Sequence, residues 1–110
     1  MTQIPKRLRA IYCPMSEPTF YLLLLMQEPN YGYSIIQEAS DLTGGEVVFS
    51  PGTLYGGIKK LLADGLIQLD HAENRRKLYI LTELGEALLK IEKRRILRLC
   101  ANAQGEAYRD

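Results

Sequence analysis

The chain has little of the residue types on which metal sites and most enzymes depend. Its 110 residues include two cysteines, one histidine and no tryptophan. Cys13 and Cys100 do not form a CxxC pair and His71 stands alone, so a metal site of the usual Cys/His kind would lack ligands. The same three side chains are the candidates for a nucleophile and its base, and nothing in their spacing brings them together. We expect no metal, no cofactor and no enzymatic activity.

Long apolar segments are missing as well. The longest, residues 20–26, is far below the roughly 20 residues that span a bilayer. The apolar stretch near the N-terminus, residues 9–14, is too short and too broken for a secretory signal. These absences predict a cytoplasmic protein with no membrane partner and with reduced thiols at Cys13 and Cys100. A redox-sensing role for either thiol is kept as an alternative.

An excess of positive charge is the third feature that the chain lacks. It has 14 lysines and arginines against 13 aspartates and glutamates, a net charge of +1. Composition alone therefore does not predict binding to nucleic acid. The basic residues are nevertheless grouped near the start, at 59–60, at 75–77 and along 90–98. A chain of this length buries one modest core, which indicates a single small domain or an oligomer of it.

Capping signals and apolar periodicity predict three helices in the first part of the chain. The first begins at Ser16, with a proline in its first turn, and ends at Pro29. The second follows a turn at residues 30–32 and stops at the two glycines 44–45. Its buried stripe consists of Ile35, Ile36, Ala39 and Leu42.

The third helix has the clearest start signal in the sequence. Ser50 is a good N-cap and Pro51 a good first residue, and the helix runs to about Gly65. Its apolar face comprises Leu54, Ile58, Leu61, Leu62 and Gly65. The opposite face is small and basic, with Gly52, Gly56, Lys59, Lys60 and Ala63 pointing outward and Thr53 and Tyr55 on the flanks.

Two short strands follow this helix. Residues 66–69 and 78–81 are branched or aromatic runs suited to strands. The polar segment between them, residues 70–77, is expected to form the tip of a hairpin. The basic residues of that tip are Arg75, Arg76 and Lys77.

A long helix capped by Thr82 ends the chain and reaches about Ala103, a length of roughly 30 Å. Its apolar arc approaches half the circumference, which is more than contact with one small domain requires, so we expect a second copy of the chain to cover part of it. The fold class is therefore mainly α with a two-stranded β wing: a winged helix-turn-helix plus a long C-terminal dimerisation helix. The expected divisions are an N-terminal arm or short helix at 1–15, a DNA-binding domain at 16–82, and the dimerisation helix and tail at 83–110.

The joint position of the basic groups carries the functional prediction. A capped helix with a basic outer face, followed directly by a hairpin with a basic tip, is suited to place the helix in a DNA groove and the wing against phosphates. The predicted DNA contacts are Tyr33, Ser50, Gly52, Thr53, Tyr55, Lys59, Lys60, Arg75, Arg76 and Lys77. Gly56 either lets the helix backbone approach DNA or reflects packing, whereas Gly57 is better explained by packing. The rival interpretation is a winged-helix module that docks a protein through the same surface.

Four blocks of the sequence resemble the PadR family of bacterial winged-helix transcription factors. Residues 31–36 (YGYSII) resemble its HGYEI turn, 50–55 (SPGTLY) its SPGTLYP helix start, 64–67 (DGLI) its EGLI strand entry and 75–85 (RRKLYILTELG) its RRKYYRLTEEG segment. The resemblance covers about residues 18–90. It implies a homodimer that binds a palindromic operator, usually as a repressor, and is released by a small ligand.

The resemblance also implies a second set of site residues, at the dimer interface or the ligand site. By this likeness the set comprises Phe20, Leu24, Leu88, Leu89, Glu92, Ile96, Leu99 and Cys100. Similar drug-sensing members use a tryptophan on the last helix to sandwich planar ligands. Ile96 stands at that place here, which favours an aliphatic or small ligand. The family's frequent proline is replaced by Gly56, and the first tyrosine of its strand pair by Leu78.

Overall fold

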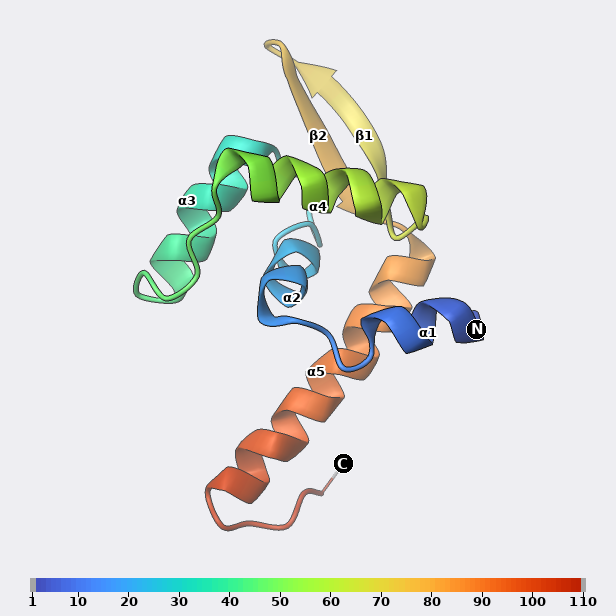
Figure 1. The fold of residues 1–110 in the computed structure, drawn as a ribbon, viewed down its shortest axis with the longest axis vertical. Helices are drawn as coiled ribbons and strands as arrows, with labels where there is room; N and C mark the ends of the chain where they lie inside the picture. The colour runs from blue at the N-terminus through green and yellow to red at the C-terminus, as the bar shows by residue number, and fades with distance from the viewer. Residues whose placement is uncertain (1, 110) are drawn as a thin grey trace.

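The structure, a computed structural model, describes residues 2–109 and has the predicted class (Figure 1). The described elements are α1 (Lys6–Tyr12), α2 (Glu17–Leu24), α3 (Gly32–Leu42), α4 (Pro51–Ala63), β1 (Ile67–Glu73), β2 (Arg76–Leu81) and α5 (Glu83–Ala103). The two strands pair antiparallel to form the wing. The sequence left two alternatives for the N-terminal segment, an arm or a short helix, and the structure has a short helix there, α1. Within residues 2–109, no helix is long and apolar enough to cross a membrane.

Three helices begin at the predicted caps. The side-chain oxygens of Ser16, Ser50 and Thr82 each accept a hydrogen bond from the backbone N–H three residues later, at 3.3, 3.2 and 3.1 Å. These bonds satisfy donors that the first helical turn would otherwise leave unpaired. Helix α4 therefore starts where the sequence places it, and this start fixes the orientation of its outer face.

The predicted end of the first of these helices at Pro29 is wrong. Helix α2 ends at Leu24, and the chain then turns to bring Asn30 beside Tyr79 of β2. The two residues exchange backbone hydrogen bonds of 3.0 and 2.8 Å. Asn30 thus forms an isolated antiparallel bridge with β2, next to the two-stranded sheet. This bridge attaches the base of the wing to the segment just before α3.

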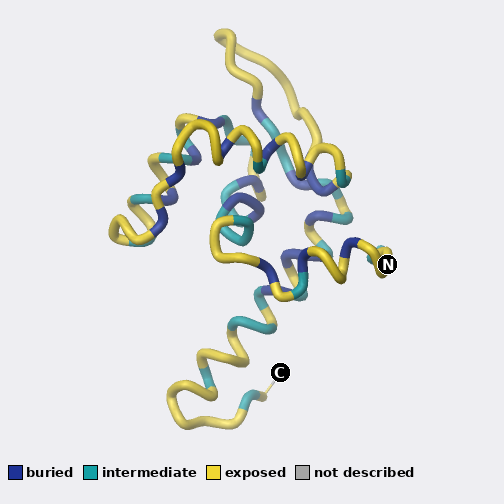
Figure 2. Tube along the Cα trace, in the orientation of Figure 1, coloured by how far each residue is buried: buried dark blue, intermediate teal, exposed yellow. Residues whose placement is uncertain are grey.

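The core lies among α2, α3, α4 and the first half of α5 (Figure 2). Its fully buried side chains include Leu23, Met26, Ile35, Leu54 and Leu88. The prediction that Leu42 belongs to the buried stripe of α3 is wrong, since 61% of this residue is exposed. It occupies the last position of α3, where the helix extends past the elements that cover its other apolar residues (Figure 2).

The wing strands are longer than the sequence indicates. Residues 71–73 and 76–77, expected in the hairpin tip, are paired in the ladder, and only Asn74 and Arg75 form the loop. Both faces of this outer part of the wing are exposed, so the strands show no alternation of apolar and polar residues. The register shifts between Leu69 and His71, which leaves Asp70 as a bulge.

Helix α1 contacts the C-terminal end of α4. Tyr12 donates a hydrogen bond of 2.5 Å from its hydroxyl to Asp64, the residue that follows α4, and Arg7 lies 3.7 Å from the same carboxylate. Burial, followed by the hydrogen bond to Asp64, raises the pKa of Tyr12. The phenol thus stays protonated and remains a donor in this contact.

Candidate nucleic-acid interface

The outer face of α4 is open to solvent along its whole length. Gly52, Thr53, Tyr55, Gly56 and Lys59 are all exposed. A Cβ added at Gly52 or Gly56 would meet nothing within 4 Å. On this face the helix backbone is accessible to another macromolecule.

Gly57 has a different environment from Gly56. A Cβ at Gly57 would lie 2.7 Å from Cδ1 of Leu22 in α2. The glycine therefore allows α2 and α4 to pack closely, which matches the interpretation from the sequence. No comparable contact explains Gly56.

Replacing Gly56 by alanine separates stability from binding. We expect the free energy of unfolding to rise by about 0.5–1 kcal/mol, because alanine is the better helix former and the site has room for its methyl group. If the backbone approaches DNA here, the affinity for DNA should fall in the same variant. Urea unfolding and a DNA titration measure the two effects, and unchanged DNA affinity would assign Gly56 to weak local propensity alone.

A groove joins the start of α3, the middle of α4 and the wing. Its volume is about 350 Å³, and its lining residues are Tyr31, Gly32, Tyr33, Tyr55, Arg75, Arg76, Lys77 and Tyr79. Five residues of the predicted DNA-contact set thus come together, from three separate elements. The exposed fractions of Tyr33 and Tyr55 are 71% and 57%, so both phenols are available to a ligand of the groove.

Gly32 lets α3 and Tyr55 of α4 approach closely at this groove, a contact that the sequence did not predict. A Cβ at Gly32 would lie 2.6 Å from the hydroxyl oxygen of Tyr55 and 2.9 Å from Cζ. Only glycine lets the Tyr55 ring lie across the first turn of α3. The YGY sequence at residues 31–33 was the available signal, but it marked a turn and gave no indication of this contact.

The cationic groups of the wing are not neutralised by the chain itself. Within residues 2–109, Arg75, Arg76 and Lys77 form no ion pair. Arg76 instead places Cζ 4.6 Å from the centroid of the Tyr31 ring, a cation–π arrangement that leaves its N–H groups able to bind an anion.

The acidic groups of the wing face its only histidine. His71 lies 2.5 Å from Asp70 and 3.7 Å from Glu73. The hydrogen bond to Asp70 is the main reason that the pKa of His71 is raised. Glu73 stands opposite Arg76 in the ladder, but its carboxylate pairs with His71 on its own strand.

The loop of the wing has an unfavourable backbone at a basic residue. Asn74 and Arg75 have φ angles of 49° and 63°, the left-handed values that a two-residue loop of type I′ requires. Asparagine tolerates this conformation, whereas arginine adopts it at a cost of about 1 kcal/mol or more. A glycine would suit the loop better, so the arginine indicates a use for its charge.

Replacing Arg75 by glycine should relieve that cost and weaken binding. We expect the free energy of unfolding to stay equal or rise by up to about 1 kcal/mol, because glycine adopts positive φ without strain. The affinity for DNA should drop severalfold with the lost charge. Arg75→Asn is the matched control, since it keeps the favourable loop and also removes the charge. A glycine variant that binds as well as the wild type would exclude Arg75 as a contact.

Three residues of the predicted set have structural contacts. Ser50 and Thr53 hydrogen-bond each other through their hydroxyls at 3.0 Å while Ser50 caps α4. The Nζ of Lys60 lies 5.5 Å from the centroid of the Tyr12 ring, which turns this lysine toward α1 and away from the groove. Lys59 remains exposed on the side of α4 that carries Tyr55.

The residues predicted for a dimer interface or ligand site differ in how far the chain itself buries them. Leu88, Leu89 and Glu92 are buried by the chain itself, so a partner cannot contact their side chains without rearrangement. Phe20, Leu24 and Ile96 are half-buried, whereas Leu99 and Cys100 are exposed. The outer half of α5 extends away from the core and is largely exposed (Figure 2).

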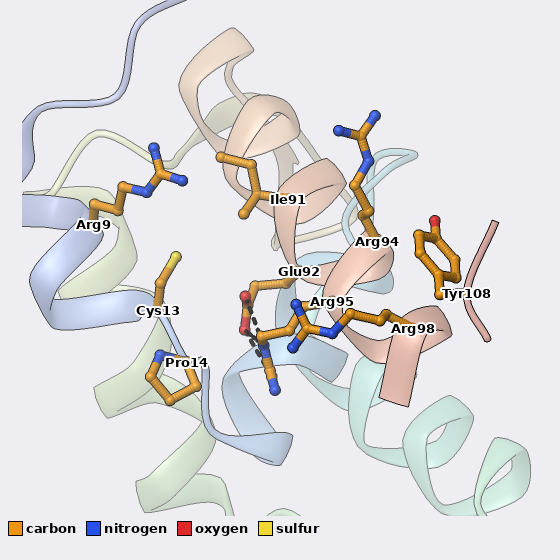
Figure 3. A pocket seen from close by; sticks show the side chains of 9 residues that line it. All are labelled: Arg9, Cys13, Pro14, Ile91, Glu92, Arg94, Arg95, Arg98 and Tyr108. Atoms are coloured by element: carbon orange, nitrogen blue, oxygen red, sulfur yellow. Dashed lines mark hydrogen bonds and ion pairs between the residues drawn. The ribbon is translucent and has the colours of Figure 1, made fainter. Parts of the chain in front are cut away.

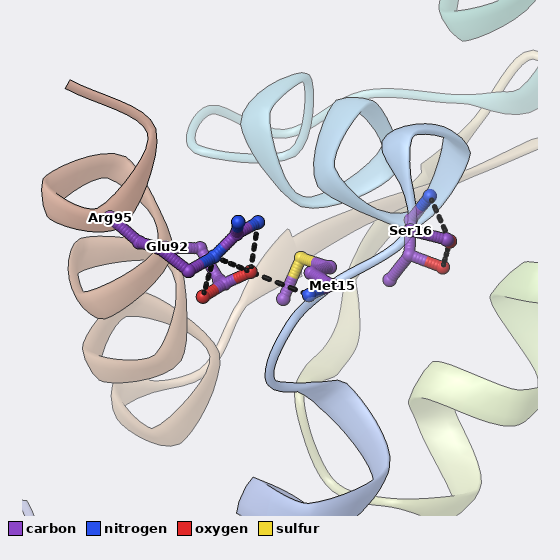
Figure 4. A network of polar contacts seen from close by, with 5 residues as sticks. Met15, Ser16, Glu92 and Arg95 are labelled. Atoms are coloured by element: carbon purple, nitrogen blue, oxygen red, sulfur yellow. Dashed lines mark hydrogen bonds and ion pairs between the residues drawn. The ribbon is translucent and has the colours of Figure 1, made fainter. Parts of the chain in front are cut away.

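Glu92 forms an internal ion pair at the centre of this region (Figure 4). Its carboxylate accepts hydrogen bonds of 2.9–3.1 Å from Arg95 and one of 2.6 Å from the backbone N–H of Met15. Burial opposes ionisation of Glu92, but the bonds from Arg95 and Met15 outweigh it and lower its pKa. The pair attaches the segment after α1 to α5.

Comparison with known proteins gives a family match. The model of the family described as "Transcriptional regulator PadR-like family" matches residues 21–91. The "Uncharacterized protein X" of Lysinibacillus sphaericus is 32% identical over 72 residues, which cover 62% of this chain. The chain spans 66% of the length of that relative.

Solved structures share the fold. A PadR-like transcription factor from Bacteroides fragilis is 28% identical with a TM-score of 0.64, over 79% of this chain and 86% of that one. A transcriptional regulator from Clostridium thermocellum is 27% identical with a TM-score of 0.62, over 79% and 90%. PadR of Bacillus subtilis, solved in complex with operator DNA, is 24% identical with a TM-score of 0.61, over 71% and 46%.

Proposed function

Since the chain belongs to the PadR-like family of transcriptional regulators, we propose that it is a DNA-binding repressor that acts on a palindromic operator as a homodimer. The outer face of α4 enters the major groove, and the wing contacts the backbone or minor groove. The observation that carries this proposal is the groove in which Tyr33 and Tyr55 meet the unpaired basic residues of the wing. The DNA complex of the similar Bacillus subtilis protein supports the choice of partner.

The contacts fall into two classes by what they can read. Arg75, Arg76 and Lys77 bind phosphates, which gives affinity without sequence preference. Thr53, Tyr55 and Lys59 stand on the helix that faces the base edges, and changes there alter the preferred sequence as well as the affinity. A palindromic site follows from two copies related by a twofold axis.

The second copy binds along residues 83–110. Leu99, 48% exposed, and the exposed Cys100 give one face of the outer half of α5 an apolar surface that the chain itself does not cover. Half-buried Ile96 adjoins it. Association of two such helices buries this surface and places two copies of the α4 and wing surface in one assembly.

Binding of the purified protein to its own upstream DNA tests the proposal, with the mass of the complex measured by light scattering. We expect a dimer on the DNA and an affinity that falls steeply between about 50 and 200 mM salt, because bound phosphates release counterions. A monomer that binds no DNA at low salt would refute the proposal.

The alternative function is docking of a protein on the same surface. The net charge of only +1 favours it, and it predicts that binding depends only weakly on salt.

A redox-sensing role is not favoured at Cys13. Burial, followed by the charge of Glu92 (Figure 3), raises the pKa of this thiol and disfavours the reactive thiolate.

A further inference from the structure

The side chain of Arg76 reaches from the wing to the start of α3. Its Cζ lies 4.6 Å from the centroid of the Tyr31 ring, and Tyr31 directly precedes the first residue of this helix. Residues 71–77, the outer part of the wing, are all exposed. An arginine on such a surface samples many rotamers, so an aromatic ring that holds its guanidinium group reduces this freedom before any ligand arrives.

Tyr31 itself is held by hydrogen bonds on both sides of its backbone. It is half-buried and is the N-cap of α3, where its carbonyl accepts a hydrogen bond of 3.0 Å from the N–H of Ile35. Its own N–H donates to the side-chain oxygen of Asn30 at 2.9 Å. Asn30 in turn exchanges backbone hydrogen bonds of 3.0 and 2.8 Å with Tyr79 of β2. The Tyr31 backbone is therefore fixed relative to the base of the wing.

The guanidinium of Arg76 keeps its charge available. Glu73, opposite Arg76 in the ladder, is 3.7 Å from His71 on its own strand. Within residues 2–109, Arg76 forms no ion pair. A cation–π contact orients a guanidinium without neutralising it, so the group can still bind an anion.

We propose that Tyr31 is a positioning residue, which orients Arg76 at the groove so that this arginine meets a DNA phosphate with its conformation already set. Both residues line the groove together with Tyr55 of α4, so the phosphate lies beside the helix that reads the bases. An arginine that is ordered in advance loses less conformational freedom on binding, which raises the affinity without a further contact to DNA. This role rests on the proposed DNA-binding function.

The contact between the two side chains is tested in the free protein by NMR. The ring current of Tyr31 should shift the Hε signal of Arg76 upfield, and Tyr31→Leu should remove this shift. Tyr31→Phe is the matched control, because it keeps the aromatic face and should keep the shift. An Arg76 Hε signal at the same position in the wild type and in Tyr31→Leu would overturn the proposal. Amide spectra of the same samples confirm that each variant is folded.

The effect on binding is measured with the full chain and its own upstream DNA. Tyr31→Leu should lower the affinity about three- to tenfold, whereas Tyr31→Phe should bind like the wild type. When Arg76→Ala is already present, Tyr31→Leu should change the affinity by less than about twofold, because no guanidinium is left to orient. Tyr31→Leu should also keep the wild-type slope of log affinity against log salt, since Arg76 still reaches its phosphate. Arg76→Ala should lose about one unit of slope for each subunit.

Three results of the DNA titrations would overturn the positioning role. An equal loss in Tyr31→Phe and Tyr31→Leu would assign the effect to the phenol hydroxyl. An equal loss from Tyr31→Leu with and without Arg76→Ala would assign it to the local structure of α3. Unchanged affinity in Tyr31→Leu would show that orienting Arg76 does not matter. If the wild type binds no DNA at all, the proposed function fails, and the Hε signal still decides whether Tyr31 holds Arg76.

Discussion

Replacing Arg75 and Arg76 together by alanine should lower the affinity for DNA by about 10- to 100-fold near physiological salt. Both side chains line the groove between α3, α4 and the wing, and neither is neutralised within the described residues. Each phosphate contact adds close to one unit to the slope of log affinity against log salt, so the double variant should lose about two units of slope for each subunit, or about four for the dimer. Operator and unrelated DNA should be affected alike. Fluorescence anisotropy with both DNAs over a series of salt concentrations measures the affinity and the slope.

The matched control removes the same charge from other surfaces. Lys6 and Lys90 are exposed on α1 and α5 and do not line the groove. Lys6→Ala/Lys90→Ala should change the affinity by less than about threefold, through long-range electrostatics alone. Equal losses in the two double variants would show that net charge, and not the wing, determines binding.

Replacing Glu92 by alanine should lower the free energy of unfolding by about 3–5 kcal/mol. The side chain is fully buried, and its removal leaves Arg95 and the N–H of Met15 without their acceptor. This is a large part of the total stability of a small domain. Urea denaturation followed by circular dichroism measures the loss, with the exposed Glu86→Ala on the same helix as control and an expected change within about 0.5 kcal/mol.

Two further measurements show whether the ion pair, and not packing alone, is the source of the stability lost in Glu92→Ala. Because the pKa of Glu92 is lowered in the folded state, its contribution is present above the ordinary pKa of glutamate and disappears as the pH falls through the folded value. Glu92→Gln should abolish that part of the acid sensitivity. In a double-mutant cycle, Glu92→Ala/Arg95→Ala should cost less than the sum of the single changes. Additive losses would contradict the pairing.

The sequence predicted the elements that depend on local signals. The caps at Ser16, Ser50 and Thr82 depend on residues within one or two turns, so a single sequence contains the whole signal. The apolar face of α4 was predicted in part: Leu54, Ile58 and Leu61 are buried, but Leu62, predicted on the same face, is 37% exposed. The predicted boundaries of the wing strands were wrong because no such local signal marks them. Its outer strands are held by backbone pairing with both faces exposed, and no side-chain pattern reports that arrangement.

The sequence did not predict contacts between residues that are far apart in the chain. Nothing marks Gly32 as the neighbour of the Tyr55 hydroxyl, or Glu92 as the partner of a backbone N–H 77 positions earlier. The spacing of Glu92 and Arg95, three residues apart on a helix, was the one available signal for their pairing. Such a spacing is common on exposed faces, where it gives no indication of burial.

Mapping the DNA-contacting surface by NMR would show whether α3, α4 and the wing bind DNA together. In this experiment, amide chemical shifts of the labelled protein are recorded with and without its own upstream DNA at low salt. We expect the largest changes at residues 31–33, along the outer face of α4 and at residues 74–77. Changes confined to α1 and α5, with those three segments unaffected, would contradict it.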